Sequence, residues 1–477
     1  MAPILGVRST LLLSVTLLLS SCAWDGVGAS DALHTELARD LGGPERDDVG
    51  ALSLGRRLLA QRTAPVSSDS LTLTHCFRLA LTNSDSLRAR GEDLFSSELQ
   101  EREAIASLLP SVSLYANHTK DSNAIRFSGF GSFQPSERTG YGFTVTETLD
   151  PTVFPRLDVI SEVRRIQALS LRDERDRLLF AVASDFFAVL ALEADVRVLH
   201  ESLVSARESS RVLRARNTNG TAREDEALLA EASAAEAESR LIRARAERDR
   251  ARAQLSTKIG QPLPARLDDT YEVRPGPRDI PRLIDLALRQ RYDLEAARRG
   301  VAEATARKHS AIASYLPRAE LMFNHLTETE DGFNSQLDWT LGLNLSWTLF
   351  DSGGREARLA RAYSAIRQRE HELRELEKGI RLEVEDAVLA FQALEQALPS
   401  LRSQDRAAGA AQEVVKARLA LGSATQLEAL AASASRENAA RDLTRTLLAR
   451  KLAALRIRLA VGDLRRSAPV AALVTHE

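Results

Sequence analysis

Several residue classes are scarce in this sequence. Aromatic residues make up 5% of the 477 positions, and the chain has only two Cys and two Met residues. Lys and Arg number 64 against 66 Asp and Glu, which leaves a net charge of −2. Because there is no basic excess, the chain is not expected to bind nucleic acid. With so few Met residues, it also lacks the Met clusters of a conduit for soft metal ions.

Motifs that mark enzymes are absent as well. The sequence has no P-loop, no Cys-x-x-Cys pair and no His-Glu-x-x-His motif. Its eight His residues are scattered. His118 and His325 fall at the ends of equivalent predicted strands. We interpret them as residues at the rim of a loop and not as metal ligands. We therefore predict a protein that is not an enzyme and that has no cofactor or metal site.

The N-terminal residues 1–21 have the pattern of a secretion signal. Arg8 supplies the positive charge, and the apolar run from Leu11 to Leu19 is too short to cross a bilayer as a mature helix. The run Leu19-Ser20-Ser21-Cys22 resembles a bacterial lipobox, in which the Cys is diacylated and becomes the mature N-terminus. We predict a covalent lipid on Cys22, which would tether the chain to a membrane. Ordinary cleavage after Ala23 is the alternative.

The rest of the chain is internally duplicated. The markers Leu79-Ala80-Leu81, Leu87 and Leu109-Pro110 recur as Leu286-Ala287-Leu288, Leu294 and Leu316-Pro317, all at one offset (317 − 110 = 207). Gly220 and Gly260 have the same spacing as Gly422 and Gly462 (260 − 220 = 40). Self-similarity over half a chain indicates a fold built from two equivalent structural repeats.

These markers divide the chain into six predicted parts. Residues 1–21 are the signal peptide, and residues 22–70 are a lipidated N-terminal extension without a long period. The first repeat covers 71–260 and the second covers 282–462, each with a helix, two strands and a long helical hairpin. A Pro-rich linker, 261–281, joins the repeats, and 463–477 form a short polar tail.

Helical sequence dominates both repeats. Helices are expected from about 70–74 to 109, over 157–216 and 222–259, and from 356 to 421 and onward to 461. A helix of about 60 residues spans roughly 90 Å, much longer than an ordinary globular helix. Such lengths indicate coiled-coil packing or a helical tube. Pro399 lies inside one of these long helices and is expected to kink it.

Each repeat also contains two strand-like runs. They cover 111–119 and 141–149 in the first repeat, and 319–324 and 339–349 in the second, with loops predicted over 121–140 and 327–334. The last run alternates most clearly. Its apolar row is Trp339, Leu341, Leu343, Leu345 and Trp347, and its polar row is Thr340, Gly342, Asn344, Ser346 and Thr348.

This alternation fits a transmembrane strand with a lipid-facing row and a lumen-facing row. Its length matches a tilted membrane strand of about 9–11 residues, and the Trp residues fit an interfacial aromatic girdle. A half-buried strand of a soluble sheet is the commoner alternative, but the chain has no other strands to pack against it. About eight strands are needed to close a barrel, so four strands per chain predict closure by oligomerisation.

The order of these elements resembles the TolC-type outer-membrane efflux family. The likeness covers about 71–462 and is carried by Leu349-Phe350-Asp351-Ser352-Gly353-Gly354-Arg355 between the last strand and a long helix. The counterpart in the first repeat, Leu149-Asp150-Pro151, is degenerate. The resemblance implies a homotrimer with a shared twelve-stranded β-barrel in the outer membrane and an α-helical periplasmic tunnel. It also implies two partners, a periplasmic adaptor protein and an inner-membrane pump.

The resemblance further implies a gate at the periplasmic tips of the helical hairpins. Family members often have acidic residues six and nine positions after the Gly that turns the long helix. Here those positions are Glu428 and Ala431, counted from Gly422, and Glu226 is the equivalent of Glu428 after Gly220. We predict Glu428 and Glu226 as gate residues, and the turns at Gly220 and Gly422 as adaptor contacts. Surface carboxylates without a gating role are the alternative.

The sequence therefore predicts a passive outer-membrane exit duct, lipid-anchored and driven by a partner pump. The alternative is a periplasmic helical lipoprotein that forms no channel and acts as an adaptor or envelope scaffold.

Overall fold

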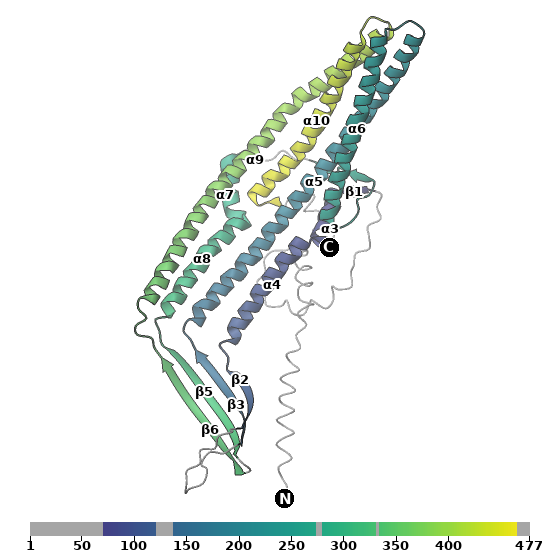
Figure 1. Ribbon diagram of the computed structural model, residues 1–477. Coiled ribbons are helices and arrows are strands. Elements are labelled where there is room, and N and C mark those ends of the chain that lie inside the picture. Colours follow the sequence, from purple (N-terminus) through teal and green to yellow (C-terminus); the bar gives the residue numbers. More distant parts are fainter. Residues whose placement is uncertain (1–69, 121–136, 273–278, 331–332, 465–477) are drawn as a thin grey trace. The chain divides into compact units, whose positions relative to one another are not determined.

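The computed structural model describes residues 70–120, 137–272, 279–330 and 333–464 (Figure 1). Up to the linker the elements are β1 (Ser70–Thr72), α3 (Leu73–Asn83), α4 (Asp85–Ala106), β2 (Ser111–Lys120), β3 (Glu137–Leu149), α5 (Val153–Thr218) and α6 (Glu224–Ile259), and the linker contains β4 (Arg266–Asp268). The second repeat contains α7 (Ile280–Gln290), α8 (Tyr292–Ala313), β5 (Arg318–Glu330), β6 (Phe333–Ser346), α9 (Gly354–Ala420) and α10 (Gln426–Val461).

The duplication and the mainly helical fold are confirmed. The order helix, helix, strand, strand, long helix, helix occurs twice, as α3 to α6 and again as α7 to α10. Gly220, Gly260, Gly422 and Gly462 all have φ between 70° and 78°, a left-handed conformation that favours glycine. At Gly220 and Gly422 a Cβ would meet nothing within 4 Å, so the backbone conformation, and not space, requires glycine there.

The single helix predicted up to residue 109 is wrong, because two helices occupy this segment. The break falls at Ser84, whose backbone is extended and whose hydroxyl accepts a hydrogen bond from the Leu87 N–H at 3.3 Å. The break between α7 and α8 falls at Arg291, the equivalent position at the same offset of 207 (291 − 84). There the guanidinium donates to Glu383 at 2.6 Å and to the Ala460 carbonyl at 3.1 Å. Polar side chains therefore stabilise both breaks, which no Gly or Pro marks.

Other segments also differ from the prediction. β3 begins at Glu137, inside the loop predicted over 121–140. The predicted loop over 327–334 is wrong, because β5 continues to Glu330 and β6 begins at Phe333. Antiparallel backbone hydrogen bonds extend this ladder through polar residues that carry no alternation signal. The Pro-rich linker contains β4, which pairs in parallel with β1, and α7 begins at Ile280 within it. The long helix α9 continues helical through Pro399 from Gly354 to Ala420.

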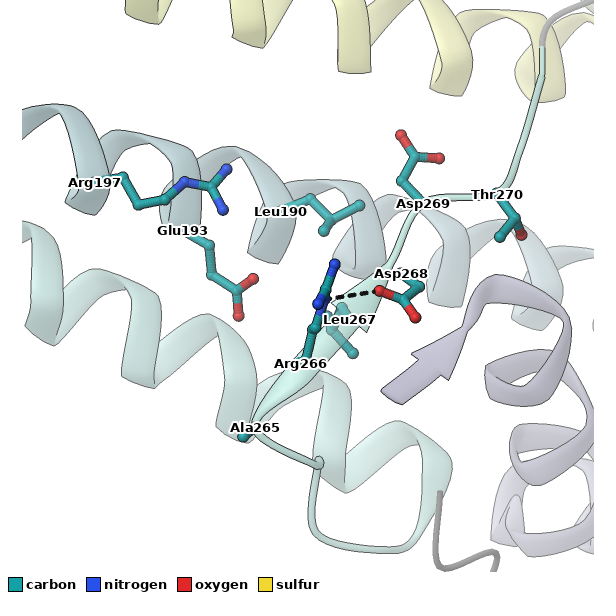
Figure 2. Close-up of a pocket in the computed structure, with 9 residues that line it drawn as sticks. All are labelled: Leu190, Glu193, Arg197, Ala265, Arg266, Leu267, Asp268, Asp269 and Thr270. Atoms are coloured by element: carbon teal, nitrogen blue, oxygen red, sulfur yellow. Dashed lines mark ion pairs between the residues drawn. The ribbon is translucent and has the colours of Figure 1, made fainter. Parts of the chain in front are cut away.

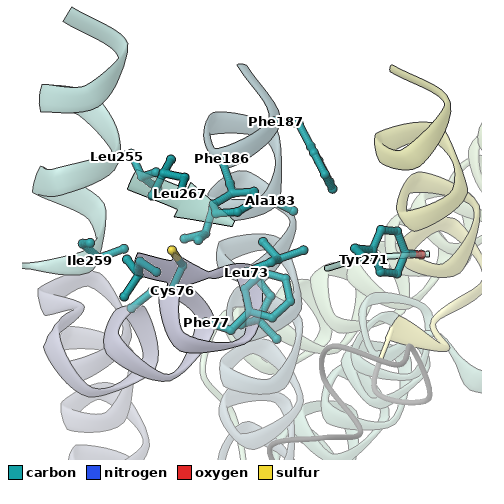
Figure 3. Packing of buried hydrophobic residues seen from close by; sticks show 14 of the residues in the cluster. Leu73, Cys76, Phe77, Ala183, Phe186, Phe187, Leu255, Ile259, Leu267 and Tyr271 are labelled. Carbon is teal, nitrogen blue, oxygen red and sulfur yellow. The ribbon is translucent and has the colours of Figure 1, made fainter. Parts of the chain in front are cut away.

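The described residues divide into two units. One consists of residues up to 92, 171–291 and those from 379, and the other consists of 93–170 and 292–378. The first unit contains an apolar core, shown in Figure 3, where Cys76 and Phe77 of α3 pack against Phe186 of α5 and Leu255 of α6. All four side chains are fully buried. Burial raises the pKa of the Cys76 thiol to about 12, so this thiol is an unreactive core residue.

A buried ion pair lies on the apolar stripe of α5. Arg175 is 1% exposed, between the buried Leu171 and Leu179 one turn before and after it. Its guanidinium donates from Nε at 3.0 Å and from Nη2 at 2.8 Å to one oxygen of Asp176, which is also buried. Two charges in an apolar environment depend on each other, because either one alone is strongly disfavoured there.

We predict that Arg175→Ala lowers the free energy of unfolding by about 3–5 kcal/mol, because Asp176 then remains buried without its counterion. The matched control is Arg177→Ala on the same helix, where the Arg side chain is 60% exposed and pairs with Asp173. The control should cost no more than about 1 kcal/mol. Thermal unfolding followed by circular dichroism checks both, and equal losses in the two variants would contradict the assignment.

Candidate functional site

The four-stranded sheet has the order β2-β3-β5-β6, and every neighbouring pair is antiparallel. Residues directly opposite each other in this register lie on the same face, so the register defines rows across all strands. One row is Val112, Val145, Phe323 and Leu341, and the next is Leu114, Phe143, His325 and Trp339. A third row places Leu321 opposite Leu343, with Glu147 as the one charged member. The sheet therefore has one predominantly apolar face.

This apolar face is exposed in the single chain. Leu114 is 73% exposed, Leu343 72% and Trp339 67%. Rings on β3, β5 and β6 contact one another along the face, with centroids 5.9 Å apart for Phe143 and Phe323 and 6.4 Å for Phe323 and Trp339. Water-soluble proteins rarely leave such a large apolar patch uncovered.

The opposite face is polar and hydrogen-bonded. The predicted lumen-facing residues Thr340, Gly342, Asn344 and Ser346 lie on it, opposite Asn324, Met322, Glu320 and Arg318 of β5. The Tyr115 hydroxyl donates to the Asn324 side-chain oxygen at 2.9 Å, and the Thr144 hydroxyl donates to the same oxygen at 3.1 Å. The sheet thus has one apolar face and one polar face. Which face meets lipid and which meets a lumen stays a prediction.

Both outer strands of this sheet have a free edge within the described chain. β2 pairs only with β3, and β6 pairs only with β5. Unpaired backbone N–H and C=O groups on a strand edge recruit another strand and are not tolerated in lipid.

We predict that Gly142→Ala destabilises the sheet, because a Cβ on Gly142 would lie 2.0 Å from the His325 carbonyl oxygen and 2.9 Å from the Tyr115 hydroxyl. Overpacking of this kind costs about 1–3 kcal/mol. The matched control is Gly342→Ala on the same polar face, where the nearest atom lies 3.9 Å from the added Cβ. Thermal unfolding of the purified protein compares the two. A Gly142→Ala protein as stable as the control would contradict this packing.

The turn after β6 has its own set of contacts. β6 ends at Ser346, so Trp347 and Thr348 lie beyond the strand, which corrects the predicted strand end at 349. The Trp347 Nε1 donates to the Tyr315 carbonyl at 3.0 Å, and the guanidinium of Arg355 lies 4.9 Å from the Tyr315 ring. The same guanidinium donates to the Leu349 carbonyl at 3.0 Å. These contacts stabilise the turn from strand to helix. They explain why β6 ends at Ser346, although the alternation of apolar and polar residues continues to 349.

Asp351 stabilises the start of α9 in this turn. Its carboxylate lies 3.6 Å from Arg355 and 3.1 Å from Arg358. Desolvation raises the pKa of Asp351, but the hydrogen bond from the Arg355 backbone and the two guanidinium charges outweigh this and hold the pKa below its ordinary value. Gly353 follows with φ of 84°, which explains a glycine in this turn. The adjacent Phe350 is 82% exposed.

The helix tips contain the predicted gate residues. Glu428 is exposed and occupies the third position of α10, where its carboxylate accepts from the Thr425 N–H at 3.1 Å. The Thr425 hydroxyl accepts from the Glu428 N–H at 3.2 Å, which completes a capping box. Glu226 lies half-buried in the first turn of α6. The tips also expose Leu421 at 84% and Leu427 at 71%, apolar positions that the sequence analysis missed.

One open pocket lies beside α5, and Figure 2 shows the charged side chains around it. It has a volume of about 640 Å³ and is lined by Leu190, Glu193, Arg197 and residues 265–270. Its charges are largely neutralised by other side chains, since Glu193 pairs with Arg252 at 2.5 Å and Arg266 with Asp268 at 3.0 Å. Asp269 pairs with Lys451 at 2.6 Å. This pocket therefore does not define the chemistry of a ligand.

Cys22 lies outside the described residues. Within the described ranges, no group of three or more His, Cys, Asp or Glu side chains is arranged to hold a metal ion. No helix in that part of the chain combines the length and the apolar composition needed to cross a bilayer.

The comparisons with known proteins agree with this geometry. Residues 283–463 match the model of the outer membrane efflux protein family. The fold resembles the Campylobacter jejuni CmeC outer membrane channel with a TM-score of 0.75 and 15% identity, over 91% of this chain and 97% of that one. The open state of the Neisseria gonorrhoeae MtrE outer membrane channel gives 0.71 and 22% identity, over 83% and 90%. The Vibrio cholerae outer membrane protein VceC gives 0.69 and 20% identity, over 82% and 96%.

The sequence matches no curated protein. The family match covers most of the second repeat, and the likeness to these solved structures shows that the chain has the fold of TolC-like channels.

Proposed function

We propose that this chain is one subunit of a trimeric outer-membrane channel that serves as the exit duct of a tripartite efflux or secretion system. The exposed apolar face of the four-stranded sheet, with both edges open, is the observation that carries this proposal. Lipid would cover the apolar face, and strands of neighbouring subunits would pair with β2 and β6. Three copies would give a closed barrel of about twelve strands around the polar face.

The long helices supply the periplasmic part of the duct in this proposal. α9 has 67 residues and α5 has 66, which at about 1.5 Å per residue gives roughly 100 Å each. The tips at Gly220 and Gly422, with the exposed Leu421 and Leu427, would contact the periplasmic adaptor. The chain would carry out no chemistry, and an inner-membrane pump would supply the energy. A lipid on Cys22 would add an anchor to the outer membrane.

Reconstitution in a planar bilayer tests the proposal. The purified full-length protein should require detergent, elute as a trimer, and produce discrete conductance steps. A protein that stays monomeric in buffer without detergent and gives no conductance would instead support the alternative of a soluble helical scaffold.

A second experiment tests Glu428 as a gate residue. In a trimer this carboxylate would occur three times around one axis, where grouped negative charges attract cations. We predict that Glu428→Gln reduces the cation selectivity of single channels, measured by the reversal potential in a salt gradient. Gln still accepts the hydrogen bond from the Thr425 N–H, so the capping box is kept and only the charge is lost.

The control for this experiment is Glu413→Gln on α9, an exposed carboxylate that pairs with Lys416. Its loss should leave selectivity unchanged. Unchanged selectivity in Glu428→Gln as well would remove Glu428 from the constriction.

A further inference from the structure

The duplication relates the four strands of the sheet in two pairs. The offset of 207 between the repeats makes β5 the equivalent of β2, and Arg318 the equivalent of Ser111 (318 − 111). Ser111 lies opposite Thr146 of β3, and Arg318 lies opposite Ser346 of β6. β6 is therefore the equivalent of β3 at an offset of 200 (346 − 146).

The turns after these two strands have the same offset. Leu149 precedes the turn into α5, and Leu349 precedes the turn into α9 (349 − 149 = 200). The offset obtained from the strand register and the offset obtained from the turn sequence thus agree. Equivalent residues of β3 and β6 can therefore be assigned one by one.

One pairing in the sheet joins the two repeats. β3 of the first repeat pairs with β5 of the second, from Arg138 opposite Glu330 to Leu149 opposite Ala319. The equivalents of β3 and β5 are β6 and β2, the two strands that have an open edge within the described chain. The pairing between repeats has no counterpart inside one chain, so its counterpart would join β6 of one subunit to β2 of the next.

The pairing of β3 with β5 also gives the register of this contact between subunits. Thr144 of β3 lies opposite Asn324 of β5. The equivalent of Thr144 is Asn344 (144 + 200), and the equivalent of Asn324 is Asn117 (324 − 207). Asn344 of one subunit would thus lie opposite Asn117 of the next. This register keeps the faces of the sheet continuous, because Asn117 shares the polar face of β2 with Tyr115.

The side chains at these positions suit a hydrogen bond between subunits. Within the chain, the Thr144 hydroxyl donates to the Asn324 side-chain oxygen at 3.1 Å. The equivalent side chains of Asn344 and Asn117 are exposed, and neither has a hydrogen bond to another described residue. Each amide has both donors and an acceptor, so two opposed amides satisfy one another.

We propose that Asn344 of one subunit hydrogen-bonds Asn117 of the next, and that this pair sets the register in which the subunits join. The occupant of each open edge is a second copy of this chain, because the missing pairing repeats one that the chain makes between its own repeats. A trimer has this contact at three boundaries, on the polar face of the sheet. The inference rests on the proposed function and adds to it the residues that meet.

Disulfide cross-linking of the full-length protein in detergent tests the register. Residues directly opposite each other in an antiparallel pair have Cα atoms about 4.5–5.5 Å apart, a separation that a disulfide spans. After oxidation, the Asn344→Cys/Asn117→Cys protein should shift on a denaturing gel from the position of one chain to those of two and three linked chains. Cys76 is buried, and the two single-Cys variants control for native thiols.

Two matched pairs make the cross-linking specific. Asn344→Cys is combined with Tyr115→Cys or with Thr119→Cys, which lie two residues to either side of Asn117 on β2. A displacement of two residues along a strand is about 7 Å, which places these pairs outside the range of a disulfide. Both should stay at the position of one chain. Cross-linking of either control pair in place of the predicted pair would overturn the register.

Charge substitutions test the hydrogen bond without added cysteines. Asn344→Asp or Asn117→Asp alone leaves an amide opposite a carboxylate, so a donor remains. The double variant places two carboxylates opposite each other at every boundary, where like charges destabilise a sheet. Its trimer fraction should fall about tenfold below that expected from the two single variants combined.

An opposite-charge pair checks that this loss comes from the contact itself. Asn344→Asp combined with Asn117→Lys should restore the trimer fraction of the parent protein, because opposite charges then face each other. Native mass spectrometry measures the fraction in every variant. A double Asp variant that loses no more than the two single variants combined would show that these side chains do not meet, and would overturn the proposal.

Conductance separates this inference from the proposed function. A trimer that cross-links through Asn344 and Asn117 but does not conduct would refute the exit duct and leave the register in place. A conducting trimer that cross-links only through a control pair would refute the register and leave the exit duct in place.

Discussion

The structure depends on one constraint, the apolar face of a four-stranded sheet, which the described part of the chain leaves exposed. The rows led by Val112 and Leu114 cross four strands in register, and within the described residues β2 and β6 each have one unpaired edge. An apolar environment would cover the face, and strands from other copies would pair with the edges. In the proposed function, a membrane and an oligomer meet these two requirements together.

The duplication explains why the same long elements occur twice in the chain. Each repeat supplies two strands and one long helical hairpin, and glycines with left-handed conformations turn or end the hairpins at Gly220, Gly260, Gly422 and Gly462. Within the first unit, an apolar core around Phe77 and Phe186 packs α3 against the long helices. The charges that are buried, at Arg175 and Asp195, have counterions of opposite sign. Apolar packing and paired charge thus act at different positions along the same helices.

Short sequence patterns predicted the repeats, the tip glycines and the alternation from Trp339 to Leu345. Each pattern can be recognised from a few neighbouring residues, and the repeats follow because such short markers recur. Features that depend on distant partners were not predictable. β5 extends through Thr327 because β3 and β6 form backbone hydrogen bonds with it on either side. The composition of this segment is that of a loop, so the sequence alone predicted a loop there. Asp195 and Arg441 are 246 residues apart, so their ion pair forms only after folding. The break at Ser84 depends likewise on the hydrogen bond from the Leu87 N–H to the Ser84 hydroxyl. The residues around it have the composition of an ordinary helix, so the sequence did not indicate the break.

Native mass spectrometry of the full-length protein, released from detergent or from a nanodisc, tests the central claim most directly. The account predicts a complex of three copies that needs detergent or lipid to stay in solution, because the open strand edges and the apolar face require partners. A stable monomer in plain buffer, with the four strands protected from solvent within one chain, would contradict it.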